Sequence, residues 1–298
     1  MKPARLYQHY VWTINTLRQY KKLTLAELSE LWERDQVIGG DKLERTTFFR
    51  HRDAILSMFG VIIECEEKTH KYYIANPDVL GDGTMEGWLL STITVNTVLT
   101  DSISLRDYIL LENVPSGQEF LQTIILAIKT RHRIKIRYQK FGFEPSEKLI
   151  APYALKLFHQ RWYLLSHTGN HFATYSLDRM QMVEITNEQF EMPEGFKPES
   201  YFTEYFGVLT DETPMAHVVV RAYGKTANYL RTLPLHHSQR ELQQADEYTE
   251  FSFDIRPTYD FLGQLLSHGD GIEVVSPDDV REKMRQKIAE NLKRYQKL

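Results

Sequence analysis

The sequence predicts an α+β protein made of several domains. Its 298 residues exceed the length of one ordinary domain. Clusters of Gly, Pro, Asp and Asn at 81–83 and 113–117 interrupt the pattern of apolar residues, and the spacing of those residues changes from helical to alternating along the chain. We therefore expect a helical domain with a β-ribbon at 1–80, a helical linker at 81–118, a small β-barrel at 119–190, a connector at 191–213 and a βαββαβ domain at 214–298.

The first domain is expected to begin with two helices. Thr24 and Glu27 have the spacing of a capping box, which places the start of a second helix there. A first helix that ends near residue 20 is indicated by apolar residues at helical spacing, namely Leu6, Tyr10, Ile14 and Leu17.

A third helix is expected between Asp41 and Phe59. Asp41 and Glu44 have the spacing of another capping box, and Gly60 is suited to a left-handed C-terminal stop. At about 100° per residue one face is apolar and the opposite face is polar. The apolar face is predicted to contain Phe48, Ile55, Leu56 and Phe59, and the polar face Thr46, Thr47, Arg50 and Ser57.

Two short strands, 61–63 and 71–74, should form a β-ribbon after the third helix. Three helices followed by a ribbon indicate a winged helix-turn-helix, whose third helix enters the major groove of DNA. The simpler interpretation is a solvated basic helix face, and the acidic ribbon residues Glu64, Glu66 and Glu67 count against tight contact with phosphate. The residues that we assign to DNA contact are Arg45, Thr46, Thr47, Arg50 and His51.

Residues 86–111 carry apolar residues in a helical rhythm and are expected to form a connecting arm. After the second interruption, four alternating segments, 134–138, 149–158, 161–166 and 172–180, predict strands. The short connections at 159–160 and 169–170 are typical of hairpin turns. Strands joined in this way can close into a small barrel.

Positive charge is concentrated in this barrel segment. Residues 129–161 contain nine Lys and Arg but only two Glu, which gives this segment a net charge of +7. Because the whole chain has a net charge of −4, the rest of the chain has a net charge of −11. Cationic and aromatic residues on short strands suit a single-stranded polyanion, because phosphates take the charge and bases stack on rings. Charge is therefore segregated within a chain that is acidic overall.

Four blocks of this segment resemble the successive motifs of the WYL family, over about sixty residues. That family is similar to Sm-like barrels, is usually fused to an N-terminal winged helix, and mostly comprises bacterial transcription regulators whose WYL domain is thought to sense a nucleic acid or nucleotide. The blocks that carry the resemblance are Tyr138, 148–155 (KLIAPYAL), 161–164 (RWYL) and 176–180 (SLDRM). The 45–63 segment is similar to the recognition helix and wing of the same family.

The resemblance implies a ligand groove. Ala173 and Ser176 stand where the family often has arginines, and Lys148 supplies a point charge where arginine is common. Trp162 and Leu164 are expected to face the barrel core. The groove is expected to contain Tyr138, Lys148, Tyr153, Arg161, Tyr163 and Arg179, to which we add Lys156 from the basic run.

The last segment, 214–298, predicts the order βαββαβ, a ferredoxin-like arrangement, followed by a charged helix at 278–297. Strands are expected at 217–222, 235–242, 248–255 and 272–275, and helices at 225–233 and 259–267. The 261–266 and 272–277 segments are similar to the C-terminal extension of many WYL proteins, which the family associates with dimer contacts or ligand response.

The motifs of common enzymes are missing from the sequence, including a P-loop, a Gly-x-Ser-x-Gly elbow and a His-Glu-x-x-His helix. We therefore expect no catalytic activity, no metal site and no cofactor. A single cysteine fits a reducing compartment, and no apolar run has the length of a signal peptide or a membrane span. The protein is expected to be cytoplasmic.

The leading hypothesis is a transcriptional regulator that acts as a homodimer. Its winged helix would bind double-stranded operator DNA, and its barrel would sense a single-stranded nucleic acid or a nucleotide. The alternative is a non-enzymatic accessory module that tethers single-stranded nucleic acid to a defence or repair assembly.

Overall fold

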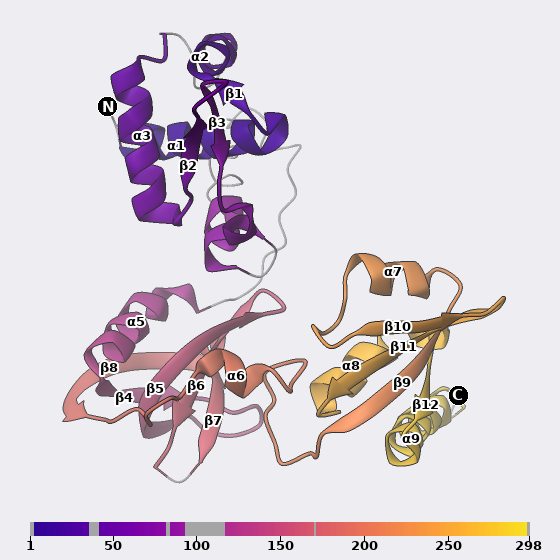
Figure 1. Cartoon of the computed structure of the whole chain (residues 1–298). Helices are drawn as coiled ribbons and strands as arrows, with labels where there is room; N and C mark the ends of the chain where they lie inside the picture. Colours follow the sequence, from indigo (N-terminus) through magenta and orange to yellow (C-terminus); the bar gives the residue numbers. More distant parts are fainter. Residues whose placement is uncertain (1–2, 36–41, 82–83, 93–116, 170, 297–298) are drawn as a thin grey trace. The chain divides into compact units, whose positions relative to one another are not determined.

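The computed structural model describes residues 3–35, 42–81, 84–92, 117–169 and 171–296 (Figure 1). The chain forms two compact units, Met1–Glu112 and Asn113–Leu298. Both contain helices and antiparallel sheets, which confirms the predicted α+β class. The part of the predicted helical arm at 93–111 lies outside the described residues.

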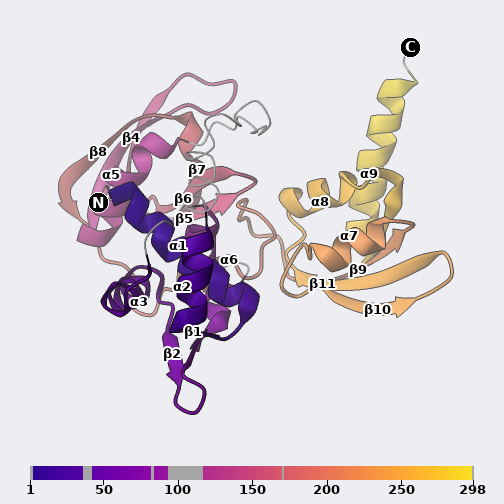
Figure 2. The ribbon, with the colours of Figure 1, turned by 90° about the horizontal axis from the view of Figure 1, so that it is seen from above.

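Among its described residues, the first unit contains three longer helices, a further helical segment at 85–92 and a small sheet. Its strands pair in the order β1-β3-β2, all antiparallel. In Figure 2 the β2–β3 hairpin extends beyond the helices of this unit. The elements are α1 (Pro3–Tyr20), β1 (Leu23–Thr24), α2 (Leu25–Arg34), α3 (Arg45–Phe59), β2 (Ile63–Glu66) and β3 (Lys71–Ile74).

Local signals place the ends of these helices. The capping box at the start of α2 is confirmed, since Thr24 Oγ1 accepts from the backbone N–H of Glu27 and the Glu27 carboxylate accepts from that of Thr24. Gly60 ends α3 in the left-handed conformation, with φ 60°. The second predicted capping box is not formed: α3 begins at Arg45, its N-cap is Glu44 without a side-chain cap bond, and Asp41 lies outside the described residues.

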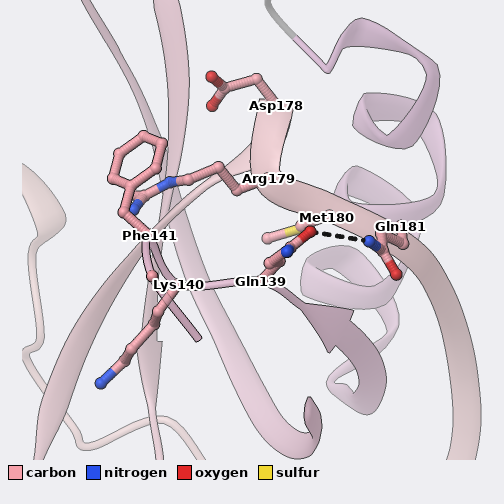
Figure 3. A pocket seen from close by; sticks show the side chains of 8 residues that line it. Gln139, Lys140, Phe141, Asp178, Arg179, Met180 and Gln181 are labelled. Atoms are coloured by element: carbon pink, nitrogen blue, oxygen red, sulfur yellow. Dashed lines mark hydrogen bonds between the residues drawn. The ribbon is translucent and has the colours of Figure 1, made fainter. Parts of the chain in front are cut away.

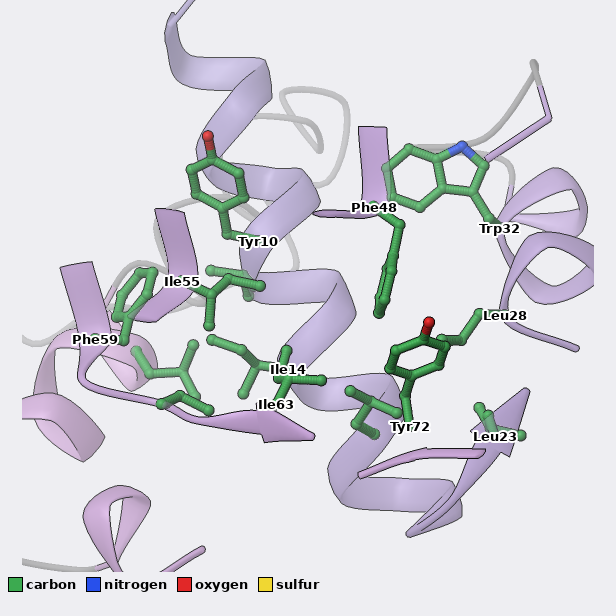
Figure 4. Close-up of a cluster of buried hydrophobic side chains, with 14 of the residues drawn as sticks. Tyr10, Ile14, Leu23, Leu28, Trp32, Phe48, Ile55, Phe59, Ile63 and Tyr72 are labelled. Carbon is green, nitrogen blue, oxygen red and sulfur yellow. The ribbon is translucent and has the colours of Figure 1, made fainter. Parts of the chain in front are cut away.

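The core of the first unit joins all three helices to β2 and β3 (Figure 4). On α3 the buried residues are Phe48, His51, Ile55 and Phe59. Leu56 was wrongly assigned to this face, because half of its surface is exposed. Leu80 and Leu90 also belong to this core, so the described beginning of the predicted linker packs with the first unit.

The second unit begins with a helix and a five-stranded antiparallel sheet in the order β7-β6-β5-β4-β8. Residues 134–138 of β4 pair with 146–150 of β5. Residues 151–158 of β5 pair with β6, with a register irregularity between Pro152 and Ala154. The elements are η3 (Gln118–Phe120), α5 (Leu121–Thr130), β4 (His132–Tyr138), β5 (Ser146–Phe158), β6 (Arg161–His167), β7 (Phe172–Ser176), η4 (Leu177–Arg179) and β8 (Met180–Gln189).

Two features of this sheet follow from local sequence. The predicted hairpin turn between β5 and β6 is present, and its residues His159 and Gln160 both have positive φ, 47° and 62°, as a type I′ turn requires. Leu164 is fully buried in the core formed with α5, and Trp162 packs against that core, as predicted. The strand predicted at 172–180 is instead interrupted by the turn η4, after which β8 forms an additional strand.

The connector after β8 covers one side of this sheet. It contains α6 (Pro198–Phe202), and its aromatic residues Phe190, Phe196 and Tyr201 pack in one cluster with Tyr153 and Phe172. Tyr153 lies at 5.5 Å from Phe190 and 5.2 Å from Phe196 between ring centroids.

The C-terminal part has the predicted order of strands and helices. Its antiparallel sheet has the order β10-β11-β9-β12, and helices α7, α8 and α9 contribute to the core on one face of it. The elements are β9 (Ala216–Tyr223), α7 (Thr226–Thr232), β10 (Arg240–Gln244), β11 (Tyr248–Ile255), α8 (Tyr259–Leu266), β12 (Ile272–Ser276) and α9 (Asp278–Tyr295). The strand predicted at 235–242 begins later, because His236 is buried in a turn where it contacts Thr203 O.

Candidate functional site

The turn η4 forms the centre of a polar corner between β7 and β8. It presents Arg179, whose guanidinium carbon lies 5.2 Å from the ring centroid of Tyr138 and 4.7 Å from that of Phe141 (Figure 3). The backbone carbonyl of Arg179 accepts a hydrogen bond from the N–H of Gln139 at 3.1 Å. This bond holds the loop after β4 against η4, so the guanidinium lies between two aromatic rings.

Tyr138 forms the floor of this corner rather than its surface. Its side chain is 3% exposed, and its ring contacts that of Tyr175 at 4.9 Å. Burial raises the pKa of the Tyr138 hydroxyl, and the nearby charge of Arg179 opposes that shift. Tyr138 therefore supports Arg179 and is not itself open to a ligand.

Asp178 organises the other side of the corner. Its carboxylate accepts a hydrogen bond from the Ser176 hydroxyl and forms an ion pair with Arg161 at 3.4 Å. Burial raises the pKa of Tyr163, and the nearby charges of Arg161 and Arg179 oppose that shift without reversing it. The structure thus brings together four predicted groove residues, Tyr138, Arg161, Tyr163 and Arg179, around Asp178.

A cavity of about 320 Å³ opens beside this corner. Gln181 Nε2 donates to Gln139 Oε1 at 3.2 Å along one wall, and Lys140 belongs to another part of the lining (Figure 3). The complete lining is Gln139, Lys140, Phe141, Gly142, Asp178, Arg179, Met180 and Gln181. Loop 139–145 is thus part of the site although no motif pointed to it; its closely spaced aromatic residues were the available signal.

The cations of the sheet fall into two groups. Lys135 is paired with Glu147 at 2.7 Å, Arg133 lies 4.0 Å from Glu188, and Arg161 is paired with Asp178. Within the described ranges, by contrast, no carboxylate lies within 4 Å of a charged nitrogen of Lys140 or Arg179, both of which line the cavity, or of Arg137 or Lys148. The cavity lining therefore contains two cations without an ion-pair partner, Lys140 and Arg179, while its one carboxylate, Asp178, is paired with Arg161.

Two predicted groove residues lie elsewhere. Tyr153 is 5% exposed beneath the connector, and its hydroxyl donates to Glu191 O at 3.4 Å. Lys156 Nζ donates to Gly207 O at 2.6 Å and lies 4.3 Å from the ring of Phe202, while burial lowers its pKa to about 8. Their assignment to the groove is wrong, because both side chains hold the connector to the sheet.

Lys148 lies on the same face of the sheet as Tyr138. It pairs with Ile136, whose side chain and that of Tyr138 point to one face of β4. Lys148 is half-buried and does not line the cavity. Lys148 is therefore on the same side of the sheet as the corner but is not part of the cavity wall.

The predicted DNA-contacting residues of α3 have different environments. Arg45, Thr46 and Arg50 are exposed, and Thr47 is half-buried. His51 is wrongly assigned to DNA contact, because it is 3% exposed and its ring lies 5.5 Å from that of His9.

Phe49, which sequence reasoning missed, positions two arginines on α3. The guanidinium carbons of Arg45 and Arg52 lie 5.4 Å and 4.8 Å from the centroid of its ring. The four-residue and three-residue spacing of these side chains on a helix was the available signal.

Among the described residues, no group of three or more His, Cys, Asp or Glu side chains could hold a metal ion. No helix in the described ranges is both long and apolar enough to cross a membrane.

Comparison with known proteins assigns both parts of the second unit. Residues 119–185 match the WYL domain, and residues 214–292 match the WCX domain. The chain is therefore a WYL domain-containing protein with a C-terminal WCX extension, which confirms the resemblance found in the sequence. No curated protein matches the sequence.

The solved structures that are similar to the chain include the following two proteins. Proteasome accessory factor B/C (PafBC) of Arthrobacter aurescens has 18% sequence identity and a TM-score of 0.37, and the similarity covers 94% of this chain and 45% of that chain. This chain thus spans less than half the length of PafBC. A CRISPR Cas-related protein has 17% identity and a TM-score of 0.41, with 87% of this chain and 75% of that chain covered.

Proposed function

We propose that the chain is a DNA-binding transcriptional regulator without catalytic activity, whose WYL domain responds to a single-stranded nucleic acid or a nucleotide. In this proposal the first unit is a winged helix-turn-helix that binds operator DNA, and the protein acts as a homodimer. The sheet of the WYL domain is an Sm-like barrel, and the WCX part has a ferredoxin-like fold. The sheet order β10-β11-β9-β12 supports the last assignment.

The element order of the first unit supports the DNA-binding role. A helix, a short strand, two helices and a hairpin follow one another, and β1 joins the hairpin in one sheet. This is the arrangement expected of a winged helix-turn-helix, in which the N-terminal half of the third helix reads the major groove. Thr46 and Arg50 are exposed on that half of α3, and Phe49 holds two further arginines beside them.

The observation that carries the sensing role is the unneutralised charge of the cavity beside η4. Arg179 is held between two aromatic rings, and Lys140 lines the same cavity. A guanidinium fixed in this way keeps its donors available to phosphate at little further cost in conformational entropy. Anionic ligands that also carry aromatic bases suit such a surface.

Mobility-shift assays on the DNA upstream of the gene would test the proposal, with and without short oligonucleotides. An Arg50→Ala/Thr46→Ala variant should lose at least about tenfold in duplex affinity, since each base or phosphate contact contributes about 1–3 kcal/mol. Ser57→Ala, a change at an exposed residue near the other end of α3, is the matched control and should bind as the wild type does. Equal duplex binding by the double variant would remove α3 from the proposal.

The acidic hairpin favours a second candidate, an accessory module that binds single strands without an operator. Glu66 is paired with Lys22 at 2.7 Å and Glu64 accepts from Tyr73 at 3.0 Å. With three glutamates and two lysines at 63–74, the hairpin has no net positive charge to offer the phosphates of a duplex. Salt-dependent binding of single strands with no preference for any duplex would support this module over the regulator.

A further inference from the structure

Loop 139–145, between β4 and β5, exposes two large aromatic side chains. Phe141 is 77% exposed and Phe143 is 70% exposed. Gly142 between them has φ 77°, and open space surrounds the position where a Cβ would lie. Two phenyl rings left in water so close together indicate a binding surface more than an incomplete core.

The loop is anchored at its first residue and closed by an internal turn, although its tip is exposed. Gln139 N–H donates to Arg179 O at 3.1 Å, and Phe143 N–H donates to Lys140 O at 3.1 Å. Phe141 also lies against the guanidinium of Arg179 at 4.7 Å. The rings are therefore presented by an ordered turn beside the positive charge of the cavity.

The amide wall of the cavity adds a hydrogen-bonding edge. Gln181 Nε2 donates to Gln139 Oε1, a bond that orients the Gln181 amide and uses one of its two N–H groups, so that the carbonyl oxygen and the second N–H remain for a ligand. A glutamine amide pairs in this way with the donor and acceptor edge of a base. The amide wall and the ring of Phe141 line the same 320 Å³ cavity, at the small end of the usual range of about 300–1,000 Å³ for ligand sites, and Phe143 lies two residues further along the loop, outside that lining.

We propose that this loop and cavity bind a single unpaired nucleobase together with its phosphate, with Phe141 and Phe143 stacking on the base. Arg179 and Lys140 contact the phosphate, and the Gln181 amide contacts the edge of the base. The inference rests on the proposed sensing role and specifies the chemistry of its ligand. The ligand is either one unit of a single strand or a free mononucleotide.

Fluorescence anisotropy of the full chain with a short labelled homopolymer tests this inference. Stacking of a base on an aromatic side chain contributes enough that Phe141→Ala and Phe143→Ala should each raise the Kd by about 5- to 100-fold. Leu149→Ala is the matched control, since Leu149 is an exposed apolar residue paired with Lys135 on the other face of β4 and β5. Its Kd should equal that of the wild type.

An abasic version of the same oligonucleotide separates stacking from charge. It should bind the wild type more weakly by at least the factor that Phe141→Ala produces, because it also loses the contacts with Phe143 and Gln181, and it should bind Phe141→Ala and the wild type equally. Gln181→Leu should reduce the differences in Kd among the homopolymers. Competition with a mononucleotide, and with inorganic phosphate alone, then distinguishes the two sources of the ligand from a simple anion site.

The outcomes separate this inference from the proposed function. Wild-type protein that binds neither oligonucleotide nor mononucleotide would overturn both. Wild-type binding that survives unchanged in both phenylalanine variants, or that inorganic phosphate displaces as well as a mononucleotide does, would overturn the base site and leave the sensing role standing. The base site is supported if the phenylalanine variants bind the intact oligonucleotide more weakly than the wild type does but bind the abasic one equally well.

Discussion

Replacing His51 with phenylalanine should make the first unit less sensitive to acid. His51 is buried against His9 and Tyr10 of α1 and Trp32 of α2. Burial, with a smaller contribution from His9, lowers the pKa of His51 from 6.5 to about 4. An unfolded chain therefore binds a proton at His51 at a pH where the folded chain does not.

The direction and size of the effect follow from this difference. Because the folded-state pKa is depressed, the stability due to a neutral His51 is complete above about pH 6.5 and is lost as the pH falls toward about 4. Between about pH 8 and about pH 5 the loss amounts to about 2 kcal/mol in the free energy of unfolding. Phenylalanine has a ring of similar size that takes up no proton, so His51→Phe should remove that part of the pH dependence.

Urea unfolding followed by tryptophan fluorescence measures this free energy. Three of the four tryptophans, Trp12, Trp32 and Trp88, belong to the first unit, so the signal reports mainly on it. His70→Asn, in the exposed turn of the hairpin, is the matched control, since asparagine tolerates the positive φ of 53° at this position. Its pH dependence should be that of the wild type.

Two results would refute the reasoning. If His51→Phe loses as much stability as the wild type between the two pH values, the buried histidine is not the source of the acid sensitivity. If the wild-type free energy does not change over that interval, His51 is not held neutral in the folded state.

Three further predictions, tested with four substitutions, concern the stability of other parts of the chain. In thermal-shift assays Gly117→Ala should lower the Tm by several degrees, because Gly117 has φ 62° and a Cβ there would overlap the backbone of Leu177. Gly142→Ala is the comparison, since Gly142 also has positive φ but lies in open space, and it should cost only about 1 kcal/mol. Thr24→Ala removes the capping box of α2 and should cost about 1 kcal/mol in urea unfolding, whereas no change would mean that the cap is not formed in solution. Asp260→Ala leaves the backbone N–H groups of Val208 and Leu209 in the connector without their carboxylate acceptor and should cost about 2 kcal/mol, with faster amide hydrogen exchange at these two residues as the specific readout.

The sequence was sufficient wherever the determining interactions are local. Thr24 and Glu27 are three residues apart, and the cap that they form needs no distant partner. Alternation along a strand likewise placed Trp162 and Leu164 toward the core. These features depend on backbone geometry that the neighbouring residues set by themselves.

Residues whose environment depends on distant segments were assigned less well. Lys156 is a cation in a basic segment, as a ligand-binding residue would be, but its hydrogen-bond partner, Gly207 O, is 51 positions away in the connector. Tyr153 is covered by aromatic residues of the same connector, which no pattern in the strand indicates. His51 and Leu56 exchanged their expected roles, because a polar ring can be buried among aromatic rings while an apolar side chain stays in water.

The candidate site was predictable in part for the same reason. Arg161, Tyr163 and Arg179 lie together as the family resemblance implied, but the turn at Asp178 was hidden in a segment that alternates like a strand and contains neither glycine nor proline. Phe141 in the loop and Gln181 in β8 gained significance only when η4 brought them beside Arg179. Their contribution depends on tertiary structure.

The length of β5 has a consequence for how this protein can vary. One uninterrupted strand of 13 residues starts directly after the exposed loop and ends with Lys156 and Phe158 at the connector, a reach of about 40 Å if fully extended. Inserting or deleting a single residue in its second half would turn Lys156 to the opposite face and release the connector, whereas a change of two residues would restore its direction. Homologous chains should therefore differ in loop 139–145 far more readily than in the number of residues between that loop and the connector's lysine.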